Sequence, residues 1–172
     1  MKTAARIVLG PSVMRVFEQG TTRRLLPVLE RTNIPQLRRV TTQARYKRWF
    51  ERNLERVAKA IEASNRRNTR IRPGLKWGHA TKILCLFVRE IVLRTRLLTD
   101  AEVTRLERFL YVPLDSVVRR ELRGCGINLP GTGIKHICRP NHFYNAQDRM
   151  AEAAERAGVP RICFDDVWAN RE

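Results

Sequence analysis

The stretch that most constrains the fold lies between Ile83 and Leu93, where only Arg89 and Glu90 are charged. A helix over these residues is apolar on most of its circumference and has to lie inside a packed domain. The chain has 172 residues, of which 43% are hydrophobic, and this is enough for one domain with a sizeable core. We therefore predict a single all-α domain over residues 1–172 with this helix at its centre.

Two charged residues flank the apolar helix in a way that suggests chemistry. Lys82 follows Gly78-His79-Ala80-Thr81, a turn-prone stretch that would place its ammonium near the start of the helix. Val112-Pro113-Leu114 is kept extended by its proline and leads into Asp115, and either Asp115 or Ser116 can cap the next helix. The sequence thus predicts a lysine and a carboxylate at two helix starts.

The helices expected between Lys82 and Asp115 would bring these two residues together. The central helix is expected from Gly78 to Leu98, and a second helix from Thr99 to Leu110, opened by a capping box of Thr99 and Glu102. If these two helices form an antiparallel pair, the chain returns to the level where it began. Lys82 and Asp115 would then open onto one cleft.

Positive charge is concentrated in the first half of the chain. Residues 1–76 hold 19 Lys and Arg against 5 Asp and Glu, whereas residues 77–172 hold 15 against 12. A surface with this excess binds DNA or RNA in a salt-sensitive way because it releases counterions from the phosphates. DNA is the favoured partner and RNA the alternative, while an acidic protein or an anionic lipid would satisfy the same charge.

The longest helix is expected to open at Asn33-Ile34-Pro35, because no Gly or Pro follows until Pro73. Apolar residues recur along it at steps of three and four and form one face: Tyr46, Phe50, Leu54, Val57 and Ile61. A basic stripe runs along another face: Arg45, Arg48, Arg52, Arg56 and Lys59. The stripe is either a phosphate-binding surface or an ordinary solvated face.

A basic loop follows this helix and extends the candidate nucleic-acid surface. Segment Asn65–Arg72 reads NRRNTRIR, a composition that suits a loop along a sugar-phosphate backbone. The candidate contacts in and after it are Arg66, Arg67, Arg70, Lys76 and Trp77. We divide the chain into a flexible N-terminal segment at 1–33, this basic helix and loop at 34–76, and a helical core at 77–172.

The last part of the core is expected to contain a loop and one more long helix. Residues Asn128–Arg139 are rich in Gly and Pro, with a short extended piece at Ile134–Cys138. A helix then runs from Pro140 to Ala157 and ends at Gly158.

Cysteine, histidine and hydropathy patterns exclude several classes of protein. The four cysteines match neither a metal knuckle nor a dense disulfide framework, and the three histidines have no metal-site spacing, so we expect no cofactor. No uncharged apolar run approaches the roughly 20 residues that cross a bilayer. We expect free thiols in a reducing, cytoplasmic compartment, at the nucleoid if DNA is bound, and no membrane partner.

Several short motifs together resemble a known family. They are Gly78-His79-Ala80-Thr81-Lys82 before the apolar helix, Val112-Pro113-Leu114-Asp115, Tyr144-Asn145-Ala146-Gln147, Gly158-Val159-Pro160 and Asp165-Asp166-Val167-Trp168. Their order is similar to that in the helix-hairpin-helix DNA glycosylases, above all the archaeal-type 8-oxoguanine DNA glycosylases. The usual hairpin of that family is replaced here by a different segment at Ile71–Gly78, and nothing before residue 71 carries the resemblance.

The resemblance implies a base-excision repair chemistry. It makes Lys82 the nucleophile that attacks the sugar of a flipped-out nucleotide, with a Schiff base and AP-lyase activity, and Asp115 the carboxylate that stabilises positive charge on the sugar. The plain alternatives are a surface lysine in a first helical turn and an aspartate that only caps its helix. Three hypotheses therefore stay open: a DNA glycosylase and AP lyase, a non-catalytic nucleic-acid binder, and a basic module that binds an acidic protein.

Overall fold

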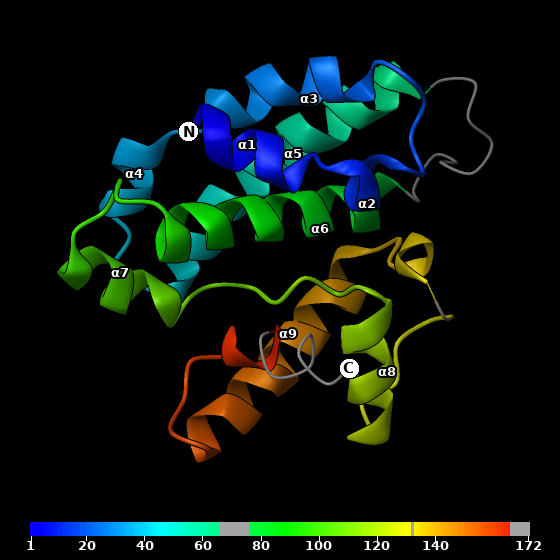
Figure 1. Cartoon of the computed structure of the whole chain (residues 1–172). Helices are drawn as coiled ribbons and strands as arrows, with labels where there is room; N and C mark the ends of the chain where they lie inside the picture. The colour runs from blue at the N-terminus through cyan, green and yellow to red at the C-terminus, as the bar shows by residue number, and fades with distance from the viewer. Residues whose placement is uncertain (66–75, 132, 166–172) are drawn as a thin grey trace.

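Two long helices run through the middle of the protein and pack against each other (Figure 1). They are α5 (Gln43–Ser64) and α6 (Lys76–Arg89). The computed structural model describes residues 1–65, 76–131 and 133–165. The predicted apolar face of α5 is buried throughout, and α6 buries Ile83, Leu84, Phe87 and Val88. The predicted central helix is therefore confirmed as part of the core.

The N-terminal residues form packed helices, where the sequence analysis expected a flexible segment. These are α1 (Lys2–Val8), α2 (Pro11–Met14) and α3 (Thr21–Glu30). α3 lies against α5, and α1 contacts both α3 and α6. The reason is burial: small and aliphatic side chains of α1 and α3 enter the common core, namely Ala4, Ala5, Val8, Leu25 and Leu29, whereas α2 has no buried residue.

The prediction of one continuous helix from Asn33 is wrong, because the chain forms two separate helices here. α4 (Ile34–Arg38) ends after five residues, and α5 starts afresh at Gln43. Each piece has its own cap: the Asn33 side chain accepts from the Gln36 N–H at 2.9 Å, and the Thr42 hydroxyl accepts from the Arg45 N–H at 3.2 Å. Val40-Thr41-Thr42 is a β-branched run of weak helix formers that ends in a good cap, which explains the break.

A side chain from a distant helix satisfies the carbonyl groups that the break exposes. Arg105 donates from Nε to the carbonyl of Val40 at 3.1 Å and from a terminal nitrogen to the carbonyl of Arg38 at 2.7 Å. Backbone acceptors at a helix end need such partners when they cannot all reach water. The α4–α5 break is thus supported by tertiary structure as well as by its local caps.

α6 continues into a π-helical turn before the chain reverses. This turn is η1 (Glu90–Arg94), and it is followed by α7 (Asp100–Glu107). The predicted capping box is confirmed, with the Thr99 N–H donating to Glu102 Oε2 at 2.8 Å and the Glu102 N–H donating to the Thr99 hydroxyl at 3.3 Å. After α7 the chain runs extended below α6 toward α8 (Ser116–Gly124) (Figure 1).

The C-terminal part completes the domain with two more elements. The expected extended piece at Ile134–Cys138 is wrong: Ile134–His136 forms a 3₁₀ turn, η2, which packs against α6. α9 (Pro140–Arg156) then ends as predicted at Gly158, whose φ is 68°. The Val159 N–H bonds back to the Ala154 carbonyl at 3.0 Å, which is a Schellman-type ending that favours glycine.

All regular elements in the described part of the chain are helical. None of these helices combines the length and the apolar character that a membrane span requires. The predicted single all-α domain is confirmed at this level.

Candidate functional site

Lys82 and Asp115 lie together, as predicted. Lys82 Nζ on α6 is 3.6 Å from Asp115 Oδ2 at the start of α8, and the two side chains are 25% and 31% exposed. Both groups are therefore accessible to a ligand yet held against the protein. A partly exposed ion pair stabilises a fold by no more than about 1 kcal/mol, so this pair adds little to the stability of the domain.

The chain brings the pair together by a different route from the one predicted. α7 has eight residues and covers only about 12 Å along its axis. The extended segment 110–115 can cover about 20 Å and supplies most of the return path (Figure 1). An antiparallel helix pair was expected to bring the chain back toward Lys82. Most of this distance is covered instead by the extended segment, which we call the strap.

Asp115 uses its two carboxylate oxygens for different partners. Oδ1 accepts from the backbone N–H groups of Val117 and Val118, both at 3.1 Å, and so caps α8. Oδ2 is the oxygen that faces Lys82. The cap fixes the orientation of the carboxylate, and the N-terminus of α8 favours its negative charge. The capping role and a role toward Lys82 are therefore compatible in one side chain.

Gln147 on α9 holds the extended strap that leads to Asp115. Its Oε1 accepts from the Val112 N–H at 3.0 Å, and its Nε2 donates to the Val112 carbonyl at 2.7 Å. The side-chain amide thus satisfies both backbone groups of one buried residue, as a neighbouring β-strand would do. This explains the Gln in the Tyr-x-x-Gln motif, whose position the sequence analysis identified without a role.

Arg161 supports the same strap next to Gln147. Its guanidinium is buried and donates to the carbonyls of Phe109, Leu110 and Gln147 at 2.9 to 3.0 Å. It also lies over the Tyr111 ring, 4.7 Å from the centroid. Burial lowers the pKa of Arg161, a cost that the three hydrogen bonds and the aromatic ring offset. The strap is consequently held at Val112 by Gln147 and at Leu110 by Arg161.

Lys82 sits deeper in its helix than the sequence analysis predicted. α6 begins at Lys76, so the stretch Gly78–Thr81 is helical and Lys82 lies in the second turn. The prediction of a turn there is wrong because Gly78 serves packing: a Cβ at this position would collide with the Ile134 carbonyl oxygen of η2. The amine of Lys82 is therefore carried by a rigid helix and not by a loop.

The predicted basic stripe lies on the exposed side of α5. Its members Arg45, Arg48, Arg52, Arg56 and Lys59 are all exposed, opposite the buried face. Lys59 forms an i,i+4 salt bridge with Glu55 at 2.7 Å. The stripe is thus neutralised at its C-terminal end, whereas its N-terminal half borders a cavity.

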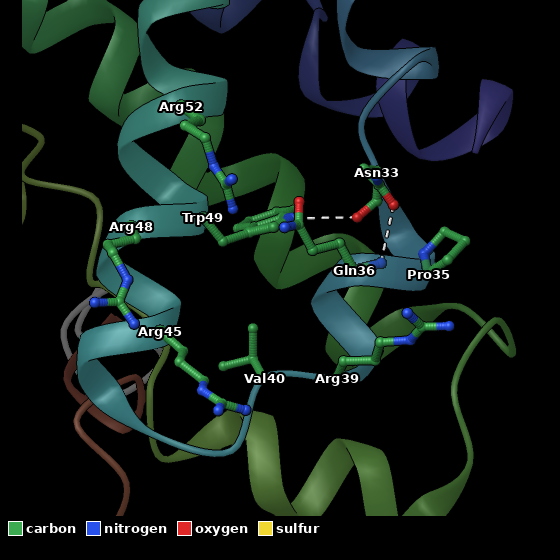
Figure 2. A pocket seen from close by; sticks show the side chains of 9 residues that line it. All are labelled: Asn33, Pro35, Gln36, Arg39, Val40, Arg45, Arg48, Trp49 and Arg52. Atoms are coloured by element: carbon green, nitrogen blue, oxygen red, sulfur yellow. Dashed lines mark hydrogen bonds between the residues drawn. The ribbon is translucent and has the colours of Figure 1, made fainter.

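That cavity lies between α4 and α5 and has a volume of about 530 Å³ (Figure 2). Its lining consists of Asn33, Pro35, Gln36, Arg39, Val40, Arg45, Arg48, Trp49 and Arg52. Trp49 reaches across from α5, and its indole N–H donates to the Asn33 carbonyl at 3.1 Å (Figure 2). We refer to this cavity as the α4–α5 pocket.

Sequence reasoning missed Arg39 as a member of this basic group. Arg39 was expected inside a continuous helix, where it would not line a pocket together with Arg45, Arg48 and Arg52. The signal that could have found it is the Thr42 cap, since a new helix start there leaves Arg39 in the connection between two helices.

The other predicted nucleic-acid contacts are placed only in part. Arg66, Arg67 and Arg70 lie outside the described residues, as do residues 71–75. Lys76 opens α6. Trp77 packs edge-on against Phe143 and Tyr144, with ring centroids 5.6 and 6.2 Å apart, so its indole belongs to an aromatic cluster.

Within the described ranges no three His, Cys, Asp or Glu side chains gather as metal ligands would. Comparisons of the chain with protein-family models, with curated proteins and with solved structures found no match.

Proposed function

We propose that this protein binds DNA and acts as a DNA glycosylase with AP-lyase activity, with Lys82 as the nucleophile. The observation that carries the proposal is the 3.6 Å approach of Lys82 Nζ to Asp115 Oδ2 on two helices distant in sequence. Both side chains are partly exposed, and the carboxylate is oriented by a helix cap. A positioned amine beside a fixed carboxylate suits nucleophilic attack on a carbon that develops positive charge.

In this proposal Lys82 Nζ, after losing one proton to solvent, attacks C1′ of a flipped-out nucleotide. The N-glycosidic bond breaks and the base leaves with a proton from solvent. Opening of the sugar ring then gives a protonated Schiff base between Nζ and C1′, and loss of a C2′ proton eliminates the 3′-phosphate. Asp115 Oδ2 stabilises the positive charge on the sugar and on the Schiff base, since it already faces Nζ.

Borohydride trapping tests this proposal because hydride reduction of a Schiff base between Lys82 and DNA leaves a stable covalent bond between the two. The protein is incubated with duplex DNA that carries an abasic site or an oxidised purine, and covalent complexes are separated by gel electrophoresis. Wild type should be trapped, and Lys82→Gln should lose trapping while DNA affinity stays within about twofold, because the substitution removes one partly exposed charge. Lys135→Gln, which removes an exposed lysine on η2, is the matched control and should be trapped normally.

Two outcomes would contradict the assignment of Lys82. Persistent trapping in Lys82→Gln would move the nucleophile elsewhere, and Lys76 at the start of α6 would be tested next. Absence of trapping on every lesion, with intact DNA binding, would remove the enzymatic part of the proposal.

A non-catalytic nucleic-acid binder is the second candidate function. The observation that favours it is the gathering of arginines at the α4–α5 pocket, which Lys82 and Asp115 do not line. Such a protein would bind DNA or RNA through its N-terminal half and leave the ion pair as a surface feature. The trapping experiment separates the two candidates, because only the first forms a covalent adduct.

A further inference from the structure

The α4–α5 pocket concentrates positive charge in a hollow. Four of its lining residues are arginines, Arg39 from the connection after α4 and Arg45, Arg48 and Arg52 from α5, and no Asp or Glu among the described residues lines it. Figure 2 shows the pocket with the α5 arginines on one side and Gln36 and Arg39 on the other. Like charges gathered in this way repel one another unless an anion lies between them.

Basic residues near the pocket form salt bridges with glutamates, whereas the four pocket arginines do not. Lys59 pairs with Glu55 at 2.7 Å, and Arg38 pairs with Glu102 at 3.9 Å. Within the described part of the chain, none of the four pocket guanidinium groups takes part in a salt bridge or a side-chain hydrogen bond. Their donors are therefore available for an external acceptor.

The shape of the pocket restricts which acceptor fits. A volume of about 530 Å³ lies in the range of sites for nucleotide-sized ligands, well above what one bare ion fills. The backbone of a duplex is a continuous convex surface and can bind along the basic stripe of α5. A phosphate group at the end of a strand can instead enter the α4–α5 pocket. Arginine forks match phosphate oxygens in geometry, and a phosphate monoester carries more charge than an internal diester.

We propose that the α4–α5 pocket binds a terminal phosphate monoester, carried either by the end of a nucleic-acid strand or by a free mononucleotide. Arg39, Arg45, Arg48 and Arg52 hold the phosphate oxygens, and Pro35 and Val40 line the adjoining space for the attached sugar. The strand-end source rests on the proposed binding of DNA, and neither source rests on catalysis by Lys82.

The experiment compares short single-stranded oligonucleotides of one sequence with a 5′-phosphate, a 3′-phosphate or hydroxyl ends. Binding to the full chain is measured by fluorescence anisotropy at fixed salt, and a mononucleotide, its nucleoside and inorganic phosphate serve as competitors. One phosphorylated end should bind about tenfold more tightly than the hydroxyl end, the gain expected from one charge-assisted contact. The mononucleotide should compete, whereas the nucleoside should not.

Substitutions on one helix separate the pocket from the stripe. Arg48→Gln with Arg52→Gln should abolish the preference for a phosphorylated end. Arg56→Gln with Lys59→Gln removes the same charge from the same helix outside the pocket, so it should lower the affinity for every oligonucleotide and keep the preference. All four side chains are exposed, and thermal unfolding of both variants checks that they fold.

Each result decides between the sources or overturns the inference. Oligonucleotide binding without any preference for a phosphorylated end, and without competition by the mononucleotide, would overturn the inference and leave DNA binding intact. Mononucleotide binding that Arg48→Gln with Arg52→Gln abolishes, without oligonucleotide binding, would support the free-nucleotide source and contradict the proposed function. If both double variants lost the preference for a phosphorylated end equally, the inference would also be overturned, because the overall positive charge of α5 would then explain that preference.

Discussion

The Lys82–Asp115 pair and the α4–α5 pocket are built by different means. In the pair, Asp115 lies at the end of the strap. Gln147 and Arg161, from distant parts of the chain, hold this strap in place through buried hydrogen bonds. The pocket arginines are exposed side chains on α5 and on the connection between α4 and α5, and none of them is buried in the core.

The difference shows that this fold uses separate regions to fix the position of two reactive groups and to gather uncompensated positive charge. A reactive pair needs atoms held in place, and buried polar contacts provide this at the cost of making the site sensitive to mutation. A binding pocket needs charge that no neighbour neutralises, and an exposed helix face provides it with little effect on stability. Changes around the strap should therefore lower stability, while changes at the pocket should alter binding alone.

The strongest expected effect is the loss of the Gln147 contacts. Gln147→Met keeps the volume and leaves the N–H and carbonyl of Val112 without their partner, at about 1–3 kcal/mol for each group. We expect the free energy of unfolding in urea to fall by about 2–5 kcal/mol. Asn145→Ala, at an exposed position of the same helix, should change it by less than about 0.5 kcal/mol. A similarly small change in Gln147→Met would mean that the strap does not depend on this amide.

Alkaline pH should weaken the buried region next. Burial raises the pKa of Tyr111 to about 12 and raises the pKa of Tyr46 well above its ordinary value. The unfolded chain loses these protons near pH 10, so above that pH the folded state binds more protons and its stability falls as pH rises. Each phenol that stays protonated contributes a loss of about 1.4 kcal/mol per pH unit.

Spectrophotometric titration combined with urea unfolding measures this effect. Phenolate absorbance should stay low through pH 10 to about 11 while the protein is folded and should rise when it unfolds. Normal ionisation of the tyrosines in the folded state near pH 10 would show that the aromatic core around the strap is open to solvent.

Removal of the α8 cap should have a smaller effect. Asp115→Ala loses both N–H acceptor contacts and should lower the free energy of unfolding by about 1 kcal/mol, whereas Asp115→Asn keeps a good cap and should cost only a few tenths. If the proposed function holds, both variants slow base release to a similar extent. A normal rate of base release in Asp115→Asn would leave this residue with the capping role alone.

The smallest effect on stability is expected at the pocket. Arg48→Gln with Arg52→Gln should change the free energy of unfolding by less than about 0.5 kcal/mol, because both side chains are exposed. The salt dependence of DNA affinity should be steep in wild type and should lose about one unit of slope for each phosphate contact removed. A flat salt response in wild type would contradict binding of nucleic acid through this face.

Features that depend on neighbouring residues were predicted from the sequence. The buried face of α5 follows from steps of three and four, and the capping box of Thr99 and Glu102 from a single spacing. The ending of α9 at Gly158 and the cap at Asp115 were predicted in the same way. In each cap and helix ending the hydrogen-bond partner lies within five residues, so the sequence pattern contains both partners.

Predictions failed where a distant partner decided the outcome. The helix expected to run on from Asn33 breaks before Gln43, and Arg105 from α7 satisfies the carbonyl groups there. Gly78 was predicted to form a turn, but it is helical because η2 packs against it. Arg39 joined Arg45, Arg48 and Arg52 in one pocket only through that unexpected break.

The sequence by itself determined the helical class, the buried face of α5, the caps and the excess of positive charge in residues 1–76, since these depend on residue type and short spacing. Only the tertiary structure decided that an extended strap returns Asp115 to Lys82, that Gln147 and Arg161 hold this strap, and that Arg39 joins the arginines of α5. The physical reason is that buried backbone groups take whichever polar side chain the packing brings to them, and spacing along the chain does not contain that information.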